Sequence, residues 1–454
     1  MNMKAEYRFK IQSKETSMIL NINKIESNIN SKTRLSEHLL GCFFRNSCEY
    51  FISLEKDINK ISPNEAIDVI SALASFKEYF NSESKWERLT LHSLDVLRKG
   101  INISMFHDFA AFSGMTHVAF SVYELSVKTP KIKIFLNGII KLLLENLSTY
   151  LEGAGKAKFD TAGNFEVIKG LSGPLRFLLS FCDDEQMRNM ACKIIDVFIN
   201  RSKDTVVLDY RMPGWHYYPN EIEASFMTDE VSNGCVNYGL SHGMGGPLAA
   251  LSLAYKNGIR KEGMQEAIDG LVAEYTQAVY YANDIAYWPG RVTFEQYVGL
   301  SEIPKTPNQM SWCYGSVGIL RALYMSGVFT ANENVMKFAL SELIKIAEMD
   351  LKDHMLRQAI VCHGFVGTAA ILNLMYLETG KSVFLHKVIE MIEIAAPLDI
   401  KTFFDSEKQR SMELDISFRA GLHDYLEGYS GILCTILSIA KGKPTEHEKR
   451  LLIV

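Results

Sequence analysis

The chain has 454 residues, of which 47% are hydrophobic and 22% are charged, a balance typical of a soluble globular protein with an ample core. This length allows two or three ordinary domains or one large repeat architecture. The net charge of -5 gives no argument for a basic surface, and nucleic acid is therefore not expected as a partner.

The start of the chain, MNMKAEYRFKIQSKE, is charged and has no apolar stretch, so we expect no secretory signal. The eight cysteines are scattered, which predicts reduced thiols in the cytoplasm. We interpret residues 1–35 as an N-terminal extension and 36–440 as one helical domain. Residues 441–454 are interpreted as a C-terminal tail, solvated over KGKPTEHEKR.

Two kinds of helix alternate along the predicted domain. Segments such as KIIDVFINRS and NENVMKFALSELIKIAEMDLK have apolar residues at three- and four-residue steps with charges between them. The other kind is a Gly-x-x-Gly step followed by an apolar helix with hardly any charge. The steps begin at Gly170, Gly243, Gly315, Gly364 and Gly428, and an imperfect earlier copy has His117 in place of its second glycine.

This alternation predicts an all-α fold, an α/α toroid with apolar inner helices and amphipathic outer helices, because a helix that is apolar all round must be buried. An α-solenoid whose glycines only ease packing is the alternative. Residues 359–377 lack charged side chains and are long enough to span a membrane, but Cys362, His363 and Asn373 favour a buried helix.

Two stretches interrupt the helical pattern, at 204–234 and 284–310. Both contain β-branched and aromatic residues with Pro and Gly turns. We expect them to form a small β-containing excursion at the mouth of the toroid.

Two of the glycine steps carry metal-ligand residue types at the same position. Cys313 stands just before one step, and Cys362 and His363 stand just before the next. Two cysteines and a histidine are natural ligands of Zn²⁺, and three ligands from distant positions resemble a catalytic site with an open fourth position. Two thiolates neutralise the charge of the metal, which favours alkylation of a bound thiol over hydrolysis. The alternative is that both cysteines are small core residues.

The motifs NGCVNYGLSHGMGG, SWCYGSVGI, CHGFVG and DYLEGYSGIL, in this order, resemble the lanthionine synthetase C-like (LanC-type) cyclases of class I lantibiotic biosynthesis. The resemblance runs from about Gly170 to Gly431. It implies an α/α toroid and an enzyme that adds cysteine thiols of a dehydrated precursor peptide to dehydroalanine and dehydrobutyrine. It also implies a cytoplasmic protein that works with a lantibiotic dehydratase and an ABC transporter in a complex at the membrane.

Residue by residue, the resemblance implies one zinc ion per chain, bound by Cys313, Cys362 and His363. It also implies active-site roles for His242 and Tyr314. Two positions depart from the family pattern: Glu166 stands where Asp is common, and Gln309 stands where many members have Arg.

The catalytic roles follow from residue chemistry. We expect His242 to transfer protons and Glu166 to orient it as a carboxylate partner. Tyr314 either hydrogen-bonds the substrate carbonyl or packs. We expect His423 and Asp424, before another glycine step, to be structural, and Trp288 and Trp312 to be packing residues.

Two other functions stay open from the sequence. One is a non-catalytic scaffold that binds the precursor peptide and the dehydratase. The other is a zinc-dependent thiol alkyltransferase of the prenyltransferase type, which needs a basic cluster for the diphosphate, and no Lys- or Arg-rich stretch adjoins the glycine steps.

Overall fold

The computed structural model describes residues 19–21, 35–103, 106, 108–154, 165–219, 231–413 and 421–454. The chain divides into two compact units, each built from separate segments of the sequence. The first unit comprises Met1–Met105, Ser121–Leu136 and Arg357–His447. The second comprises Phe106–Phe120, Asn137–Leu356 and Glu448–Val454.

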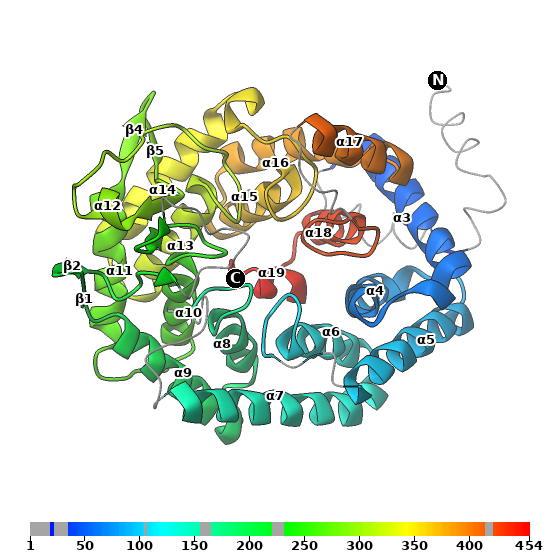
Figure 1. Cartoon of the computed structure of the whole chain (residues 1–454). Coiled ribbons are helices and arrows are strands. Elements are labelled where there is room, and N and C mark those ends of the chain that lie inside the picture. Colours follow the sequence, from blue (N-terminus) through cyan, green and yellow to red (C-terminus); the bar gives the residue numbers. More distant parts are fainter. Residues whose placement is uncertain are drawn as a thin grey trace. The chain divides into compact units, whose positions relative to one another are not determined.

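In the second unit, three apolar helices pack in a row, and each also packs against an amphipathic helix (Figure 1). The apolar helices are α8 (Ser172–Leu178), α10 (Gly245–Lys256) and α13 (Ser316–Phe329), and their partners are α9 (Glu185–Arg201), α11 (Met264–Ala278) and α14 (Glu333–Glu348). The apolar helices are buried on all sides over most of their length. The predicted alternation is therefore confirmed in this unit.

The first unit repeats this arrangement. Its inner row contains α4 (Pro63–Phe76), α18 (Tyr429–Lys441) and α15 (Phe365–Thr379), with α5 (Glu83–Asn102) on α4, α16 (Ser382–Ala395) on α15, α3 (Glu37–Asp57) on α18 and α17 (Ile400–Glu413) on α3. α4 begins at a capping box, in which Ser62 and Glu65 satisfy each other's backbone N–H and Pro63 occupies the first turn. The remaining helices are α6 (Met115–Lys128), α7 (Lys133–Ala154), α12 (Phe294–Tyr297) and α19 (Glu446–Arg450).

The glycine steps bring each inner helix close to the turn that precedes it. A Cβ atom at Gly318 would collide with the carbonyl oxygen of Trp312, and one at Gly367 would collide with that of Val361. In both cases the carbonyl belongs to the residue six positions earlier. Gly315 also has a φ of 140°, which L side chains rarely adopt. The repeated glycines therefore fix the shape of the turns that carry the candidate site residues.

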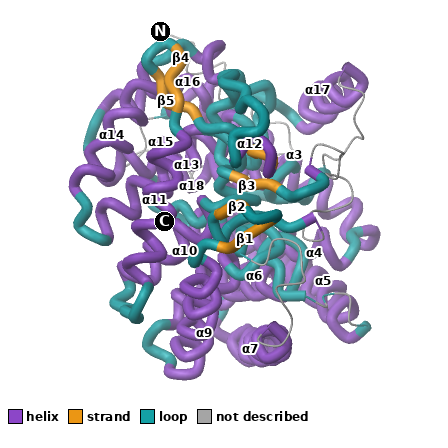
Figure 2. The backbone as a smooth tube through the Cα atoms, turned by 60° about the vertical axis from the view of Figure 1, so that its left-hand side comes forward, coloured by secondary structure: helices purple, strands orange, loops and turns teal. Residues whose placement is uncertain are grey.

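The strands form three two-stranded antiparallel sheets in the connections between helices of the second unit (orange in Figure 2). They are β1 (Thr205–Val207) with β2 (Tyr210–Met212), β3 (Cys235–Asn237) with β6 (Arg291–Thr293), and β4 (Tyr280–Ala282) with β5 (Ile285–Tyr287). Both predicted excursions thus contain strands. Residues 220–230, within the first of them, lie outside the described residues.

The predicted ends of the chain differ in outcome. Of the predicted extension 1–35, only 19–21 and Leu35 are among the described residues, and Leu20 is buried and pairs with Phe80. The solvated C-terminal tail is wrong in part, because Glu448 and Arg450 are buried. These two residues are buried because the apolar stretch that follows them packs inside the fold, where other side chains hydrogen-bond to its backbone.

The last residues of the chain pack inside the second unit. Leu451 and Ile453 are fully buried. The indole Nε1 of Trp312 donates to the Leu451 carbonyl at 3.0 Å, and Nε of Arg321 donates to the Ile453 carbonyl at 2.7 Å. Residues 448–454 therefore support the turn before α13 from within the fold. Among the described helices, none combines the length and apolarity that a membrane span requires.

Candidate active site

The candidate residues lie in the turns that immediately precede inner helices. His242 is three residues before α10, Cys313 is three residues before α13, and Cys362 and His363 are just before α15. Such turns present side chains beside the N-terminal ends of helices, where unpaired N–H groups and the helix dipole favour negative charge.

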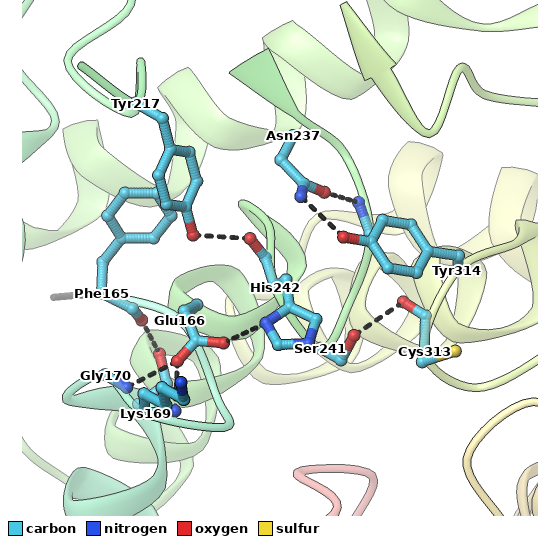
Figure 3. A network of polar contacts seen from close by, with 12 residues as sticks. Phe165, Glu166, Lys169, Gly170, Tyr217, Asn237, Ser241, His242, Cys313 and Tyr314 are labelled. Carbon is cyan, nitrogen blue, oxygen red and sulfur yellow. Dashed lines mark hydrogen bonds and ion pairs between the residues drawn. The ribbon is translucent and has the colours of Figure 1, made fainter. Parts of the chain in front are cut away.

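Glu166 and His242 form a close pair, although they lie 76 positions apart in the sequence (Figure 3). Oε2 of Glu166 lies 2.7 Å from Nδ1 of His242. The Glu166 side chain is only 3% exposed, whereas that of His242 is 37% exposed. The other carboxylate oxygen accepts from the backbone N–H groups of Lys169 and, at 2.6 Å, Gly170. The carboxylate is therefore held rigidly behind an accessible imidazole, which it orients.

The backbone around His242 is tied to neighbouring turns. The Tyr217 hydroxyl donates to the His242 carbonyl at 2.6 Å (Figure 3). Val167, next to Glu166, donates its N–H to the Ser241 carbonyl at 2.9 Å. Ser241 in turn donates its own N–H to the Cys313 carbonyl at 3.2 Å. The turns that carry Glu166, His242 and Cys313 are thus connected by direct hydrogen bonds.

Tyr314 completes this polar network. Its ring stacks beside that of His242, with centroids 6.2 Å apart and an interplanar angle of 27°. Its hydroxyl accepts a hydrogen bond from Nδ2 of Asn237 at 2.8 Å (Figure 3). Burial raises the pKa of Tyr314 to about 12, an effect that the hydrogen bond from Asn237 opposes. Asn237 was not predicted from the sequence. The only feature of the sequence that could have pointed to it is a polar side chain inside a short buried β segment.

The three predicted metal ligands form a group. Cys313, Cys362 and His363 are the one set of Cys, His, Asp or Glu side chains, within the described part of the chain, whose ligand atoms are close enough to hold a metal ion. Cys313 is 5% exposed, and the other two are half-buried. Two sulfur donors and one imidazole nitrogen fit Zn²⁺ and leave one tetrahedral position for a further ligand.

Other residues that the sequence singled out lie as follows. Trp288 and Trp312 are 1% and 0% exposed, so the expectation that they pack is confirmed. Gln309 is half-buried, four residues before Cys313. His423 is 5% exposed, and its Nδ1 lies 3.0 Å from the hydroxyl of Tyr50, as expected of a structural residue.

Comparison with known proteins agrees with this geometry. The model of the lanthionine synthetase C-like protein family matches residues 69–452. The nisin biosynthesis protein NisC of Lactococcus lactis subsp. lactis is 25% identical over 273 residues, which are 58% of this chain and 61% of that protein. The matched segment therefore spans less than two thirds of this relative.

A solved structure of a nisin cyclase aligns with a TM-score of 0.76 at 19% sequence identity and covers 90% of this chain and 97% of its own. This likeness shows the fold, so the predicted α/α toroid is confirmed. Since the family model covers most of the sequence, the chain belongs to the lanthionine synthetase C-like family.

Proposed function

We propose that this chain is a zinc-dependent peptide cyclase. Its substrate is a precursor peptide in which Ser and Thr have been dehydrated to dehydroalanine and dehydrobutyrine, and its products are lanthionine and methyllanthionine rings. The observation that carries the proposal is the Cys313, Cys362 and His363 group in a chain of this family. This donor set suits a reaction of thiols, because two thiolates already neutralise the metal.

The reaction adds an S–H group across a C=C bond. The sulfur forms a bond to the β carbon, the electrons of the double bond move toward the neighbouring carbonyl as an enolate, and the α carbon then takes a proton. No atom leaves, so the peptide keeps its mass. Bound zinc would hold the attacking sulfur as a thiolate near neutral pH.

The residues of the chain supply the proton transfers. Nδ1 of His242 is committed to Glu166 at 2.7 Å, so we assign the exchange of a proton with the substrate to Nε2. The Glu166 carboxylate stabilises the imidazolium, which makes His242 a suitable acid for the α carbon. Tyr314, beside the imidazole, is suited to the enolate oxygen.

The proposal extends to partners and location. A cyclase of this kind needs a dehydratase to prepare its substrate, and we propose that both act in the cytoplasm, with an exporter at the membrane. This part rests on the family resemblance, and co-purification with the dehydratase tests it.

The direct test incubates the purified protein with dehydrated precursor peptide and counts free thiols by alkylation and mass spectrometry. We expect thiols to disappear faster than without protein, with no change in the mass of the unalkylated peptide. Loss of thiols at the uncatalysed rate, with peptide still bound, would establish the scaffold function instead. A mass increase by an isoprenoid unit, on adding isoprenoid diphosphate, would establish the alkyltransferase.

A further inference from the structure

Asn237 is held in a fixed orientation by its surroundings. It ends β3, where its backbone pairs with Arg291 of β6, and the residue is 5% exposed. Its Oδ1 accepts a hydrogen bond from the backbone N–H of Gly239 at 3.0 Å. A backbone N–H can only donate, so the oxygen of the carboxamide must face Gly239. The amide nitrogen must then face Tyr314.

This orientation fixes the polarity of the Tyr314 hydroxyl, that is, the direction in which its hydrogen bonds run from donor to acceptor. Nδ2 of Asn237 has only protons to offer, so the phenolic oxygen is the acceptor in this 2.8 Å bond. The single hydroxyl proton therefore points away from Asn237. Among the described residues, no side chain or carbonyl takes that proton. Figure 3 shows the hydroxyl meeting the Asn237 nitrogen, with the His242 ring nearby.

The Tyr314 ring has little freedom to move. A Cβ atom at Gly239 would lie only 2.8 Å from Cδ1 of Tyr314, so the ring packs directly on the backbone of this glycine. Gly239 thus contacts the ring and also holds the carboxamide that bonds the hydroxyl. The same short segment positions both ends of the tyrosine.

We propose that Asn237 is a positioning residue that makes Tyr314 a hydrogen-bond donor to the enolate oxygen of the dehydro residue. It does so by occupying the oxygen as an acceptor, which directs the proton toward the substrate. This inference rests on the proposed cyclase function, because the oxygen that receives the proton belongs to the substrate of that reaction.

The test compares Asn237→Asp with Asn237→Ala. In Asn237→Asp, the new carboxylate has nearly the same shape and still accepts from Gly239, but its second oxygen takes the Tyr314 proton. We expect cyclisation to slow at least about tenfold in Asn237→Asp and equally in Tyr314→Phe, since each variant loses a donor to the developing charge. In Asn237→Ala the hydroxyl keeps its proton, so the loss is smaller. A merely structural Asn237 predicts the opposite order, because alanine is the greater change in packing.

A double-mutant cycle sharpens the result. If Asn237 acts through Tyr314, Asn237→Asp has no further effect in a Tyr314→Phe background. Effects that multiply, or an Asn237→Asp variant with the wild-type rate, would overturn the proposal. Should Asn237→Asp fail to fold, the same cycle with Asn237→Ala decides the question. Zinc content and thermal melting are measured for every variant.

An infrared measurement separates this inference from the proposed function. With ¹³C-labelled tyrosine, the C–O stretch of Tyr314 is the band that disappears in Tyr314→Phe. It should move to higher frequency in Asn237→Asp, because a phenol that donates to a carboxylate gains phenolate character. If the wild type shows no cyclisation but this shift occurs, the proposed function fails and the polarity of Tyr314 stands. An unmoved band refutes the polarity even in an active enzyme.

Discussion

The turns that contain Glu166 and Asp424 hold the same place in two repeats but differ in what surrounds them. Each carboxylate stands four residues before the first glycine of its step. Each accepts the backbone N–H of the residue three positions later, which is Lys169 for Glu166 and, at 2.6 Å, Glu427 for Asp424. The repeat thus supplies a carboxylate that caps the turn, independently of any catalytic use.

The neighbouring histidines make the difference. A second turn brings His242 against the free end of the Glu166 carboxylate, with 37% of the imidazole exposed. His423 is instead 5% exposed and bonded to Tyr50, and burial lowers its pKa. A catalytic pair therefore needs an accessible histidine from another turn, in addition to the carboxylate that the repeat provides.

The largest effect is expected in the cysteine turns, which are the turns that carry Cys313 and Cys362. The turn before α18 contains no cysteine. Cys362→Ala should remove zinc and reduce thiol consumption to the uncatalysed rate, because two ligands hold the metal poorly. Metal analysis and the thiol assay check this, and circular dichroism should show unchanged helix content. Cys192→Ala, on the amphipathic helix α9, is the matched control and should keep both zinc and activity. Stoichiometric zinc in Cys362→Ala would exclude this residue as a ligand.

The two histidines should separate activity from stability. His242→Asn is expected to slow cyclisation by about 10²–10⁴-fold while zinc stays bound, because it removes the group proposed to act as general acid–base. His423→Asn should leave the rate nearly unchanged and lower the melting temperature, because the buried Tyr50 hydroxyl loses its hydrogen bond with His423. A loss below tenfold in His242→Asn would make it a packing residue, and the contrast between the turns would disappear.

The carboxylates of Glu166 and Asp424 should likewise differ in whether their substitution affects activity. Glu166→Gln should slow cyclisation by about tenfold or more, because the imidazolium loses its charged partner. Asp424→Asn should not affect the rate. The amide oxygen of the new side chain still caps Glu427, so the turn keeps its shape. An equal loss of activity in both variants would mean that the carboxylate acts only as a cap.

The pH dependence of stability gives a further distinction for Asp424. Desolvation by the protein atoms around its carboxylate, and then the charge of Asp68, raise the pKa of Asp424 from 3.8 to about 6. The folded state therefore binds this proton more tightly than the unfolded state, and stability is lost as the pH rises toward 6. Asp424→Asn removes that loss, so its melting temperature relative to wild type should be higher at pH 7 than at pH 4. The opposite trend would show that the ionised carboxylate stabilises the turn.

The sequence predicted much of this because repeats leave strong patterns. The glycine steps and the alternation of helix types identified the inner helices α8, α10, α13, α15 and α18 but not α4, which has no glycine step. The shared position of Cys313 and Cys362 identified the turns that carry them. Both signals depend on periodicity, which is local in the sequence and requires no knowledge of distant contacts. The pairing of Glu166 with His242 has the same kind of signal, since both residues precede glycine steps.

What escaped prediction depends on contacts without a periodic signal. Asn237 stands outside the repeated step, and its contact with Tyr314 is a hydrogen bond between residues 77 positions apart in the sequence. The burial of Glu448 and Arg450 follows from the binding of the last residues by Trp312 and by other inner side chains. A single hydrogen bond between residues far apart in the sequence leaves no trace in the composition or in the helical spacing of apolar residues.

The smallest effect is expected at Gln309, which stands where the resemblance in sequence leads us to expect an arginine. The neutral side chain is half-buried, and the feature of this residue that shapes the turn is its carbonyl, which faces Gly315 and is kept in any variant. Gln309→Ala should therefore change the cyclisation rate by less than about twofold. Asn308→Ala is the matched neighbour: its Nδ2 donates to the Trp288 carbonyl at 2.9 Å, so this variant should lose about 1 kcal/mol of stability at an unchanged rate. A tenfold slower Gln309→Ala enzyme would place the Gln309 amide at the enolate, where it would replace the missing cation and share the role assigned to Tyr314.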